Sequence, residues 1–205
     1  MSKAAVFLDR DGVLCEERGY LHSGDKLRIF PYAAEAVRRL HEAGYWAIVA
    51  TNQSGVARGY LTEADVKRMN RELTERTGVD AVYCCPHLEG CDCRKPRTGM
   101  IDQACRDFDI DLPRSWFVGD RASDIQTGIN AGLRTALLES GYGTARLEFD
   151  VKPDYVFADL REFAVFLSER VLKMISSGTP RRTGSNTWGN RDKDEQDYLQ
   201  AEIPG

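Results

Sequence analysis

Two aspartates near the N-terminus, Asp9 and Asp11, lie one residue apart and directly follow a short apolar run, residues 4–8. A short apolar run that ends abruptly in polar residues is typical of a buried strand in a parallel sheet. Ligands of open α/β sheets bind beyond the carboxyl ends of the strands, so both aspartates are predicted to lie where such a site forms. Because two close carboxylates repel each other, we expect a cation or a proton beside them. Taken alone, the pair would also fit a solvated acidic turn.

Three polar segments further along the chain could complete such a site. Residues 51–55, Thr-Asn-Gln-Ser-Gly, follow another apolar run and offer hydroxyls and backbone amides to phosphate oxygens. Residues 94–95 are a basic Arg-Lys pair, and Asp120 follows a fourth apolar run, where its carboxylate suits a hard cation. Each segment has an ordinary alternative, which is a polar turn, a solvated surface charge or a helix cap. The helix cap fits Ser123 or Asp124 better than Asp120.

Four of the six cysteines lie within residues 84–93. In a chain without a secretory signal, such crowding favours metal binding over disulfides. Three thiols and one imidazole are a closed tetrahedral set for Zn²⁺ and leave no position for water, which indicates a structural metal. The predicted ligands are Cys85, His87, Cys91 and Cys93. Cys84 would face the other side of the strand and is predicted to pack in the core, although it stays an alternative ligand. A set of free buried thiols is the alternative to a metal site.

The elements that position these residues are strands that alternate with helices. We predict strands over residues 4–8, 45–51, 81–85, 115–119, 133–138 and 155–157. Helices are predicted from Pro31 to Gly44 and over residues 62–77, 99–108, 123–131 and 160–175, with Thr62 as a capping hydroxyl. This alternation predicts an α/β fold, a Rossmann-like doubly wound parallel sheet with right-handed crossovers.

The composition sets limits on the class of protein. The chain has 205 residues, of which 42% are hydrophobic, and a net charge of −4 from 28 basic and 32 acidic residues. We expect one domain over residues 1–175, a disordered tail over 176–205, and no nucleic-acid partner, because charges of both signs are mixed. The sequence has no apolar run long enough to cross a membrane and no signal peptide, so a cytoplasmic protein is expected. A monomer is the default expectation.

The predicted motifs occur in a defined order: an aspartate after the first strand, a hydroxyl residue after the second, a lysine before a helix and Gly-Asp after the fourth strand. In this ordered set the sequence resembles the haloacid dehalogenase superfamily, over about residues 3–140. Within the superfamily it resembles the D-glycero-D-manno-heptose 1,7-bisphosphate 7-phosphatases, in the segments Phe-Leu-Asp-Arg-Asp-Gly, Gly-Tyr, Thr-Asn-Gln-Ser-Gly-Val-Ala-Arg-Gly, Cys-Pro-His and Cys-Arg-Lys-Pro. The histidinol-phosphate phosphatases share much of this set.

The resemblance implies a Mg²⁺-dependent phosphomonoesterase. Asp9 would be the nucleophile that forms an aspartyl-phosphate, and Asp11 the general acid and base. Thr51 would donate a hydrogen bond to the phosphoryl group, and Lys95 would add positive charge. Mg²⁺ would be held by Asp9, the backbone carbonyl of Asp11, and Asp120. The cysteine loop matches the zinc-binding pattern of the same family.

The resemblance also implies a pocket open to solvent, because both positions at which larger relatives carry a cap domain are short here. Arg121 stands where the family commonly has lysine, so a planar guanidinium replaces a compact ammonium group at this position. The predicted substrate-binding residues are Arg10, Glu17, Arg18, Gly19, Tyr20, Thr51, Asn52, Gln53, Ser54, Arg94, Lys95 and Arg121.

Three functions are weighed on this basis. The first is removal of the 7-phosphate from D-glycero-D-manno-heptose 1,7-bisphosphate, and the second is a histidinol-phosphate phosphatase. The third is a non-catalytic binding protein on a phosphatase fold. A retired site would have no need to keep Asp9, Asp11, Lys95 and Asp120 together, so the set argues for an enzyme.

Overall fold

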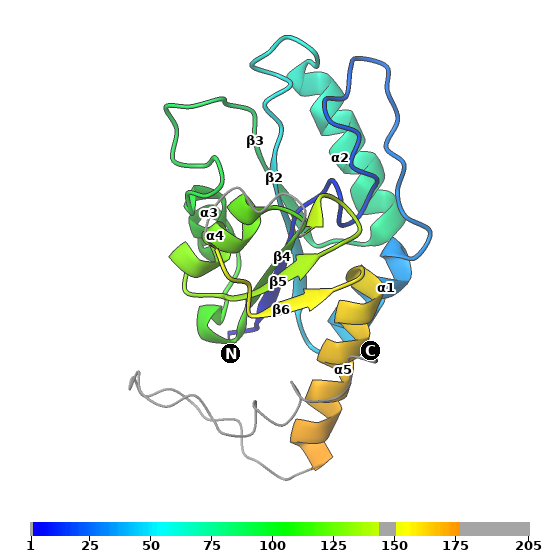
Figure 1. Cartoon of the computed structure of the whole chain (residues 1–205), viewed down its shortest axis with the longest axis vertical. Helices are drawn as coiled ribbons and strands as arrows, with labels where there is room; N and C mark the ends of the chain where they lie inside the picture. The colour runs from blue at the N-terminus through cyan, green and yellow to red at the C-terminus, as the bar shows by residue number, and fades with distance from the viewer. Residues whose placement is uncertain (1, 144–150, 177–205) are drawn as a thin grey trace, which may run out of the picture.

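The computed structural model describes residues 2–143 and 151–176. It contains a six-stranded, entirely parallel sheet in the order β3-β2-β1-β4-β5-β6 (Figure 1). The strands are β1 (Ala5–Leu8), β2 (Trp46–Asn52), β3 (Ala81–Cys85), β4 (Trp116–Gly119), β5 (Arg134–Leu138) and β6 (Tyr155–Phe157). Each begins and ends within one residue of the predicted bounds, and the doubly wound topology is confirmed.

Helices cover both faces of the sheet (Figure 1). On one face lie α1 (Ala33–Glu42), α2 (Glu63–Thr77) and α5 (Leu160–Ser176). On the other lie α3 (Gly99–Asp107) and α4 (Ala122–Asn130). A short 3-10 helix, Leu112–Arg114, which the sequence did not predict, precedes β4.

Strand β1 is buried on both faces, as expected of a central parallel strand. Its side chains alternate between the two layers of the core. Val6 and Leu8 pack in the cluster that includes α1, α2 and α5, whereas Ala5 and Phe7 pack in the cluster that includes α3. This double burial holds the strand rigidly, so the residues that follow Leu8 start from a fixed position.

The helix ends follow the predicted signals with one exception. Helix α2 begins after a capping box in which the Asp65 amide donates to Thr62 Oγ1 over 3.1 Å, and it ends at Gly78 with a φ of 79°. Helix α1 was expected to begin at Pro31 but begins at Ala33. The Ala33 amide donates to the Phe30 carbonyl over 3.0 Å, so Pro31 lies in a turn before the helix.

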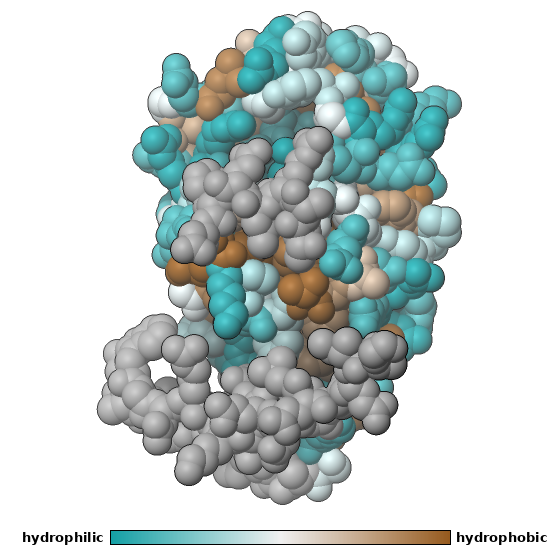
Figure 2. Space-filling view, viewed as in Figure 1, coloured by the Kyte–Doolittle hydropathy of each residue, from teal (hydrophilic) through white to brown (hydrophobic). Residues whose placement is uncertain are grey.

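The polar loops of the site lie at the carboxyl ends of the strands. The half of the molecule that carries α2 and the cysteine loop is mainly hydrophilic on the face shown in Figure 2. Within residues 2–143 and 151–176, none of the helices has the length and apolar character needed to cross a bilayer. The predicted tail lies outside the described residues from position 177 onward. The domain boundary, the cytoplasmic location and the monomer stay predictions.

Candidate active site

A cavity of about 340 Å³ opens at the carboxyl ends of β1, β2 and β4. Most of the predicted catalytic and substrate-binding residues line it: Asp9, Asp11, Glu17, Gly19, Tyr20, Asn52, Gln53, Ser54, Arg94, Lys95 and Arg121. Thr51 and Asp120 are buried beside it. Arg10 and Arg18 are not among its lining residues. Residues far apart in the sequence thus meet where parallel strands end, as the fold predicts.

Lys95 is the buried cation of the site. Its Nζ lies 2.9 Å from Asp9 Oδ1 and 2.6 Å from Asp124 Oδ1, and its side chain is 2% exposed. Asn52, the last residue of β2, holds the Lys95 backbone from both sides. Its Oδ1 accepts from the Lys95 amide over 3.1 Å, and its Nδ2 donates to the Lys95 carbonyl over 3.3 Å. The lysine is therefore fixed between two carboxylates although it lies in a loop.

Asp120 follows β4 and is fully buried. Its Oδ2 accepts from the Tyr142 amide over 2.8 Å. Its Oδ1 is buried and has no hydrogen-bond partner in the part of the chain that the structure describes. Burial, followed by the charges of Asp9 and Asp124, raises the pKa of Asp120 well above its ordinary value. An unpaired buried carboxylate oxygen beside other acids calls for a cation.

The acids around Asp120 fit a divalent cation. Oxygens of Asp9, Asp120 and Asp124 lie within 4.8 Å of one another. When ionised, these residues carry three negative charges against the one positive charge of Lys95, and the remaining two are what a divalent ion balances. Oxygen donors of this kind are the ligands that Mg²⁺ prefers. Gly12 and Gly141 leave room for the Asp120 carboxylate. A Cβ at Gly12 would lie 2.4 Å from Asp120 Oδ2, and a Cβ at Gly141 would lie 2.1 Å from the same atom.

Asp124 is a site residue that the sequence analysis assigned to helix capping alone. It does cap α4, because its Oδ2 accepts from the Arg121 amide over 3.1 Å, but its Oδ1 also contacts Lys95. The available signal was its spacing from Asp120, which places it in the first turn of the helix that starts at the strand end. Tyr142 was also missed. It lines the cavity from the loop after β5, and the guanidinium of Arg121 lies 4.1 Å from its ring centroid.

The position of Arg10 corrects its predicted contact with substrate. Its side chain is 1% exposed, and it points away from the cavity toward α2, where Nη1 donates to Asn70 Oδ1 over 3.2 Å. It also forms an ion pair with Asp11 at 2.9 Å. Arg10 lies in a bend between the two aspartates, and its side chain extends past the Asp11 carboxylate toward α2 rather than into the cavity.

Two arginines border the opening of the cavity. Arg121 Nη2 lies 2.7 Å from Glu17 Oε2, which connects α4 to the loop after β1. Arg94 Nη1 donates to the His87 carbonyl over 3.1 Å, which connects it to the cysteine loop. Tyr20 is 49% exposed beside these charges and packs against Tyr60, with ring centroids 5.3 Å apart. The opening therefore presents the guanidinium of Arg94, and that of Arg121 paired with Glu17, near an accessible aromatic ring.

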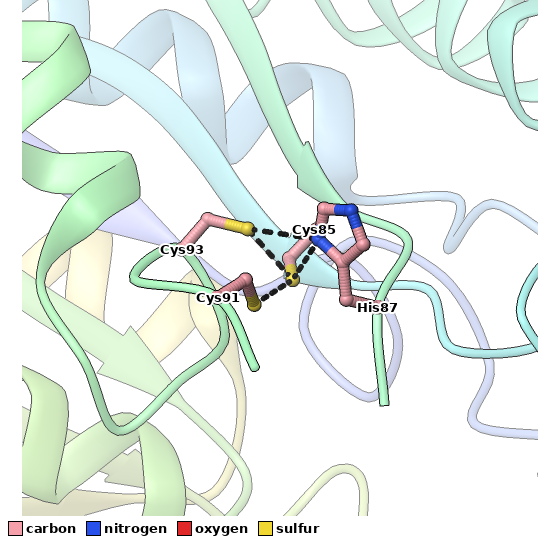
Figure 3. A group of neighbouring side chains, drawn as sticks. All are labelled: Cys85, His87, Cys91 and Cys93. Atoms are coloured by element: carbon pink, nitrogen blue, oxygen red, sulfur yellow. Dashed lines mark hydrogen bonds between the residues drawn. The ribbon is translucent and has the colours of Figure 1, made fainter. Parts of the chain in front are cut away.

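The predicted metal-binding side chains of the cysteine loop point toward one another (Figure 3). Cys85 Sγ lies 3.6 Å from Cys91 Sγ and 2.9 Å from Cys93 Sγ, and His87 Nδ1 lies 3.4 Å from Cys93 Sγ. Two sulfur ligands of a tetrahedral zinc lie about 3.8 Å apart, since each Zn–S bond is about 2.3 Å. The four donors converge as a metal site requires: the sulfurs of Cys85 and Cys91 are near this separation, and those of Cys85 and Cys93 are closer together than it. Cys84 is half-buried and packs against the core instead, as predicted.

Comparisons with known proteins agree with this geometry. Residues 92–163 match the family model described as HAD-hydrolase-like. A crystal structure of D,D-heptose 1,7-bisphosphate phosphatase from B. bronchiseptica, complexed with magnesium and phosphate, is 34% identical with a TM-score of 0.73, covering 82% of this chain and 99% of that one. The fold and the site therefore define a phosphatase of the haloacid dehalogenase class.

Curated relatives narrow the class further. The D-glycero-D-manno-heptose-1,7-bisphosphate 7-phosphatase of Thermosynechococcus vestitus is 42% identical over 182 residues, 78% of this chain and 93% of its own length. The D-glycero-beta-D-manno-heptose-1,7-bisphosphate 7-phosphatase of Haemophilus ducreyi is 37% identical, over 82% of this chain and 100% of its own length. The chain belongs to the family of heptose-bisphosphate 7-phosphatases.

Proposed function

We propose that this enzyme removes the 7-phosphate of D-glycero-D-manno-heptose 1,7-bisphosphate in a Mg²⁺-dependent reaction through an aspartyl-phosphate. The observation that carries the proposal is Lys95 held between Asp9 and Asp124, beside the unpaired oxygen of Asp120. The names of the relatives support the substrate, and the magnesium and phosphate in the B. bronchiseptica structure support the chemistry.

In this reaction Asp9 attacks phosphorus, and the bond from phosphorus to the sugar oxygen breaks. Asp11 gives a proton to that leaving oxygen and takes one from the water that hydrolyses the intermediate. Asp9, the backbone carbonyl of Asp11, and Asp120 would hold Mg²⁺. When bound, the ion lets the phosphate anion approach a carboxylate by offsetting their charges. Lys95, which pairs with Asp9, contributes a further positive charge.

The remaining predicted residues bind the substrate. The hydroxyl of Thr51 accepts a hydrogen bond from Gln53 Nε2 over 3.0 Å, so its own proton is free to be donated to a phosphoryl oxygen. Arg94 and Arg121, which border the opening, would bind the second phosphate of the sugar. Tyr20 and the loop around Glu17 and Gly19 would contact the carbon skeleton.

We further propose that Cys85, His87, Cys91 and Cys93 bind a structural Zn²⁺. The support is the convergence of their donor atoms within 4.8 Å. Burial raises the pKa of the Cys85 thiol, and a bound cation would offset that effect by favouring the thiolate. Because Arg94 and Lys95 follow the last ligand directly, such a metal would fix their positions without contacting substrate.

The experiment is a comparison of kcat/KM for heptose 1,7-bisphosphate and histidinol phosphate, with Mg²⁺ and with chelator. The proposal predicts that the heptose substrate is favoured by at least about a hundredfold, since two arginines contact its second phosphate. A preference for histidinol phosphate would support the alternative phosphatase. A protein inactive on both substrates with Mg²⁺ present would support the non-catalytic alternative.

A further inference from the structure

The side chain of Arg10 is buried beside the site, where it contacts Asp11. It has no part in the proposed reaction or in substrate binding. Its guanidinium holds the Asp11 carboxylate at both oxygens. Nε donates to Oδ2 over 3.1 Å, and Nη2 donates to Oδ1 over 3.1 Å. Such two-point contacts fix the plane of a carboxylate as well as its distance, which a single ammonium does not.

Two neighbouring elements complete the arrangement. Asn70, in α2, accepts from Arg10 Nη1 over 3.2 Å and so fixes the guanidinium from behind. Gln53, which follows β2, donates from Nε2 to Asp11 Oδ2 over 2.7 Å. The Asp11 side chain is still 17% exposed and lines the cavity, whereas that of Arg10 is 1% exposed. Arg10 and Gln53 therefore hold the Asp11 carboxylate, while the part of it that stays exposed faces the cavity.

Burying a guanidinium is costly unless its charge is paired and its donors are used. The molecule nevertheless places one directly between the two aspartates of the first motif. Both Asp11 oxygens accept hydrogen bonds from Arg10, so the position and the plane of the carboxylate are fixed.

We propose that Arg10 is a positioning residue that holds the Asp11 carboxylate as the base for the second half of the reaction. In that half, a water oxygen bonds to phosphorus, and the bond from phosphorus to the Asp9 oxygen breaks, which returns the electron pair to the Asp9 carboxylate. The proton lost by the water goes to Asp11, and inorganic phosphate leaves. Arg10 itself touches neither substrate nor water. This inference rests on the proposed function.

The test uses 4-nitrophenyl phosphate, whose leaving group departs without a proton from the enzyme. Rapid-mixing kinetics then separate formation of the aspartyl-phosphate, in the first turnover, from its breakdown, in the steady state. In Arg10→Met the ratio of breakdown rate to formation rate should fall at least about tenfold, because base catalysis is lost only in the second half. Arg10→Lys, which keeps the charge without the fork, should fall between this variant and the wild type.

Asn70→Ala provides a second measurement that does not alter Arg10, and it should lower the same ratio by a smaller factor. Arg39→Met is the matched control, because Arg39 pairs with Glu35 on the exposed surface of α1 and its loss should leave the ratio unchanged. Circular dichroism checks that each variant is folded. If Arg10→Met does not fold, Arg10→Lys and Asn70→Ala decide the question.

Equal slowing of both halves, or an unchanged ratio in the folded variants, would overturn the inference about Arg10. That result leaves the proposed substrate intact, since the ratio does not depend on which sugar is the natural one. Conversely, poor turnover of heptose 1,7-bisphosphate by the wild type would contradict the proposed substrate and leave the Arg10 comparison valid.

Discussion

The ammonium of Lys95 lies between Asp9 and Asp124, and this placement determines how the acids around it can act. Asp9 and Asp124 share the ammonium of Lys95, whereas Asp120 Oδ1 has no hydrogen-bond partner within the described residues. Asp120 is therefore the residue whose charge is least compensated in the metal-free protein. A divalent cation would relieve this imbalance, so metal binding and stability should be linked.

Asp120→Asn tests this link. At a pH of about 8 or above, where Asp120 carries its charge, this change should stabilise the metal-free protein by about 1–2 kcal/mol, because the cost of burying that charge and its repulsion from Asp9 and Asp124 are lost. The same change should abolish most of the stabilisation by Mg²⁺ and the phosphatase activity. Thermal unfolding with and without Mg²⁺ measures both effects. A variant that is less stable than the wild type without metal, yet still stabilised by Mg²⁺, would contradict this account.

At this scale the sequence predicts the site residues that stand in recognisable motifs, such as Asp9, Lys95 and Asp120, and the structure brings these three together. It did not assign Asp124 to the site, because a helix-capping aspartate and an ion-pairing one look alike in a sequence. It also assigned Arg10 to substrate, since nothing local indicates that its side chain is buried against Asn70 of α2. Both roles depend on contacts between segments that are distant in the chain.

At the scale of elements, the cysteine loop connects β3 to α3 and carries Arg94 and Lys95. It is tied to the start of α3, where the Gly99 amide donates to the Asp92 carbonyl over 3.0 Å and Arg97 donates to the Cys91 carbonyl. A Cβ on Gly99 would lie 2.5 Å from the Asp92 oxygen, so a side chain would disturb this contact. We therefore expect the loop to affect catalysis through the positions of Arg94 and Lys95.

Cys91→Ser should lose the bound zinc and lower kcat/KM at least about tenfold, because misplacing a charged group by a small distance weakens catalysis strongly. Elemental analysis of the purified protein, expected at about one zinc per chain for the wild type, measures the first effect. Cys105→Ser is the matched control and should keep both zinc and activity, since Cys105 lies in α3 outside the cluster. Full activity of a zinc-free Cys91→Ser protein would rule out the supporting role.

The strands and helices were predictable from the sequence because each signal is local. The apolar runs are short and end in polar residues, and Thr62 and Gly78 mark the ends of α2. The start of α1 was wrong by two residues, since Pro31 favours both a first helical turn and the turn that precedes it. The 3-10 helix before β4 was missed, because a single turn has no periodic pattern to detect.

At the scale of the whole molecule, the site is assembled from both halves of the sheet, because the segments that follow β1, β2, β3, β4 and β5 all contribute to its lining. Arg94 and Arg121 reach its opening from different elements, one on the cysteine loop and the other at the start of α4. Selection of a bisphosphate then depends on the distance between the phosphate that reacts and the one that is only bound. Such a distance is a property of the fold that no single motif encodes.

Arg94→Met should therefore discriminate between substrates. It should raise KM for heptose 1,7-bisphosphate about tenfold or more, because a charge-assisted contact to the second phosphate is lost. KM for a monophosphate such as 4-nitrophenyl phosphate should change little. Steady-state kinetics on the two substrates measure this difference. An equal rise in KM for both would place Arg94 at the reacting phosphate instead.

The most direct test of the central claim is to detect the phosphorylated enzyme. Wild-type protein mixed with heptose 1,7-bisphosphate and Mg²⁺, quenched in acid within milliseconds and analysed by peptide mass spectrometry, should carry a phosphoryl group on Asp9. Asp9→Asn, folded and treated in the same way, should carry none and should be inactive. An unmodified Asp9 at every time point during active turnover, or substantial Mg²⁺-dependent activity in Asp9→Asn, would contradict the account.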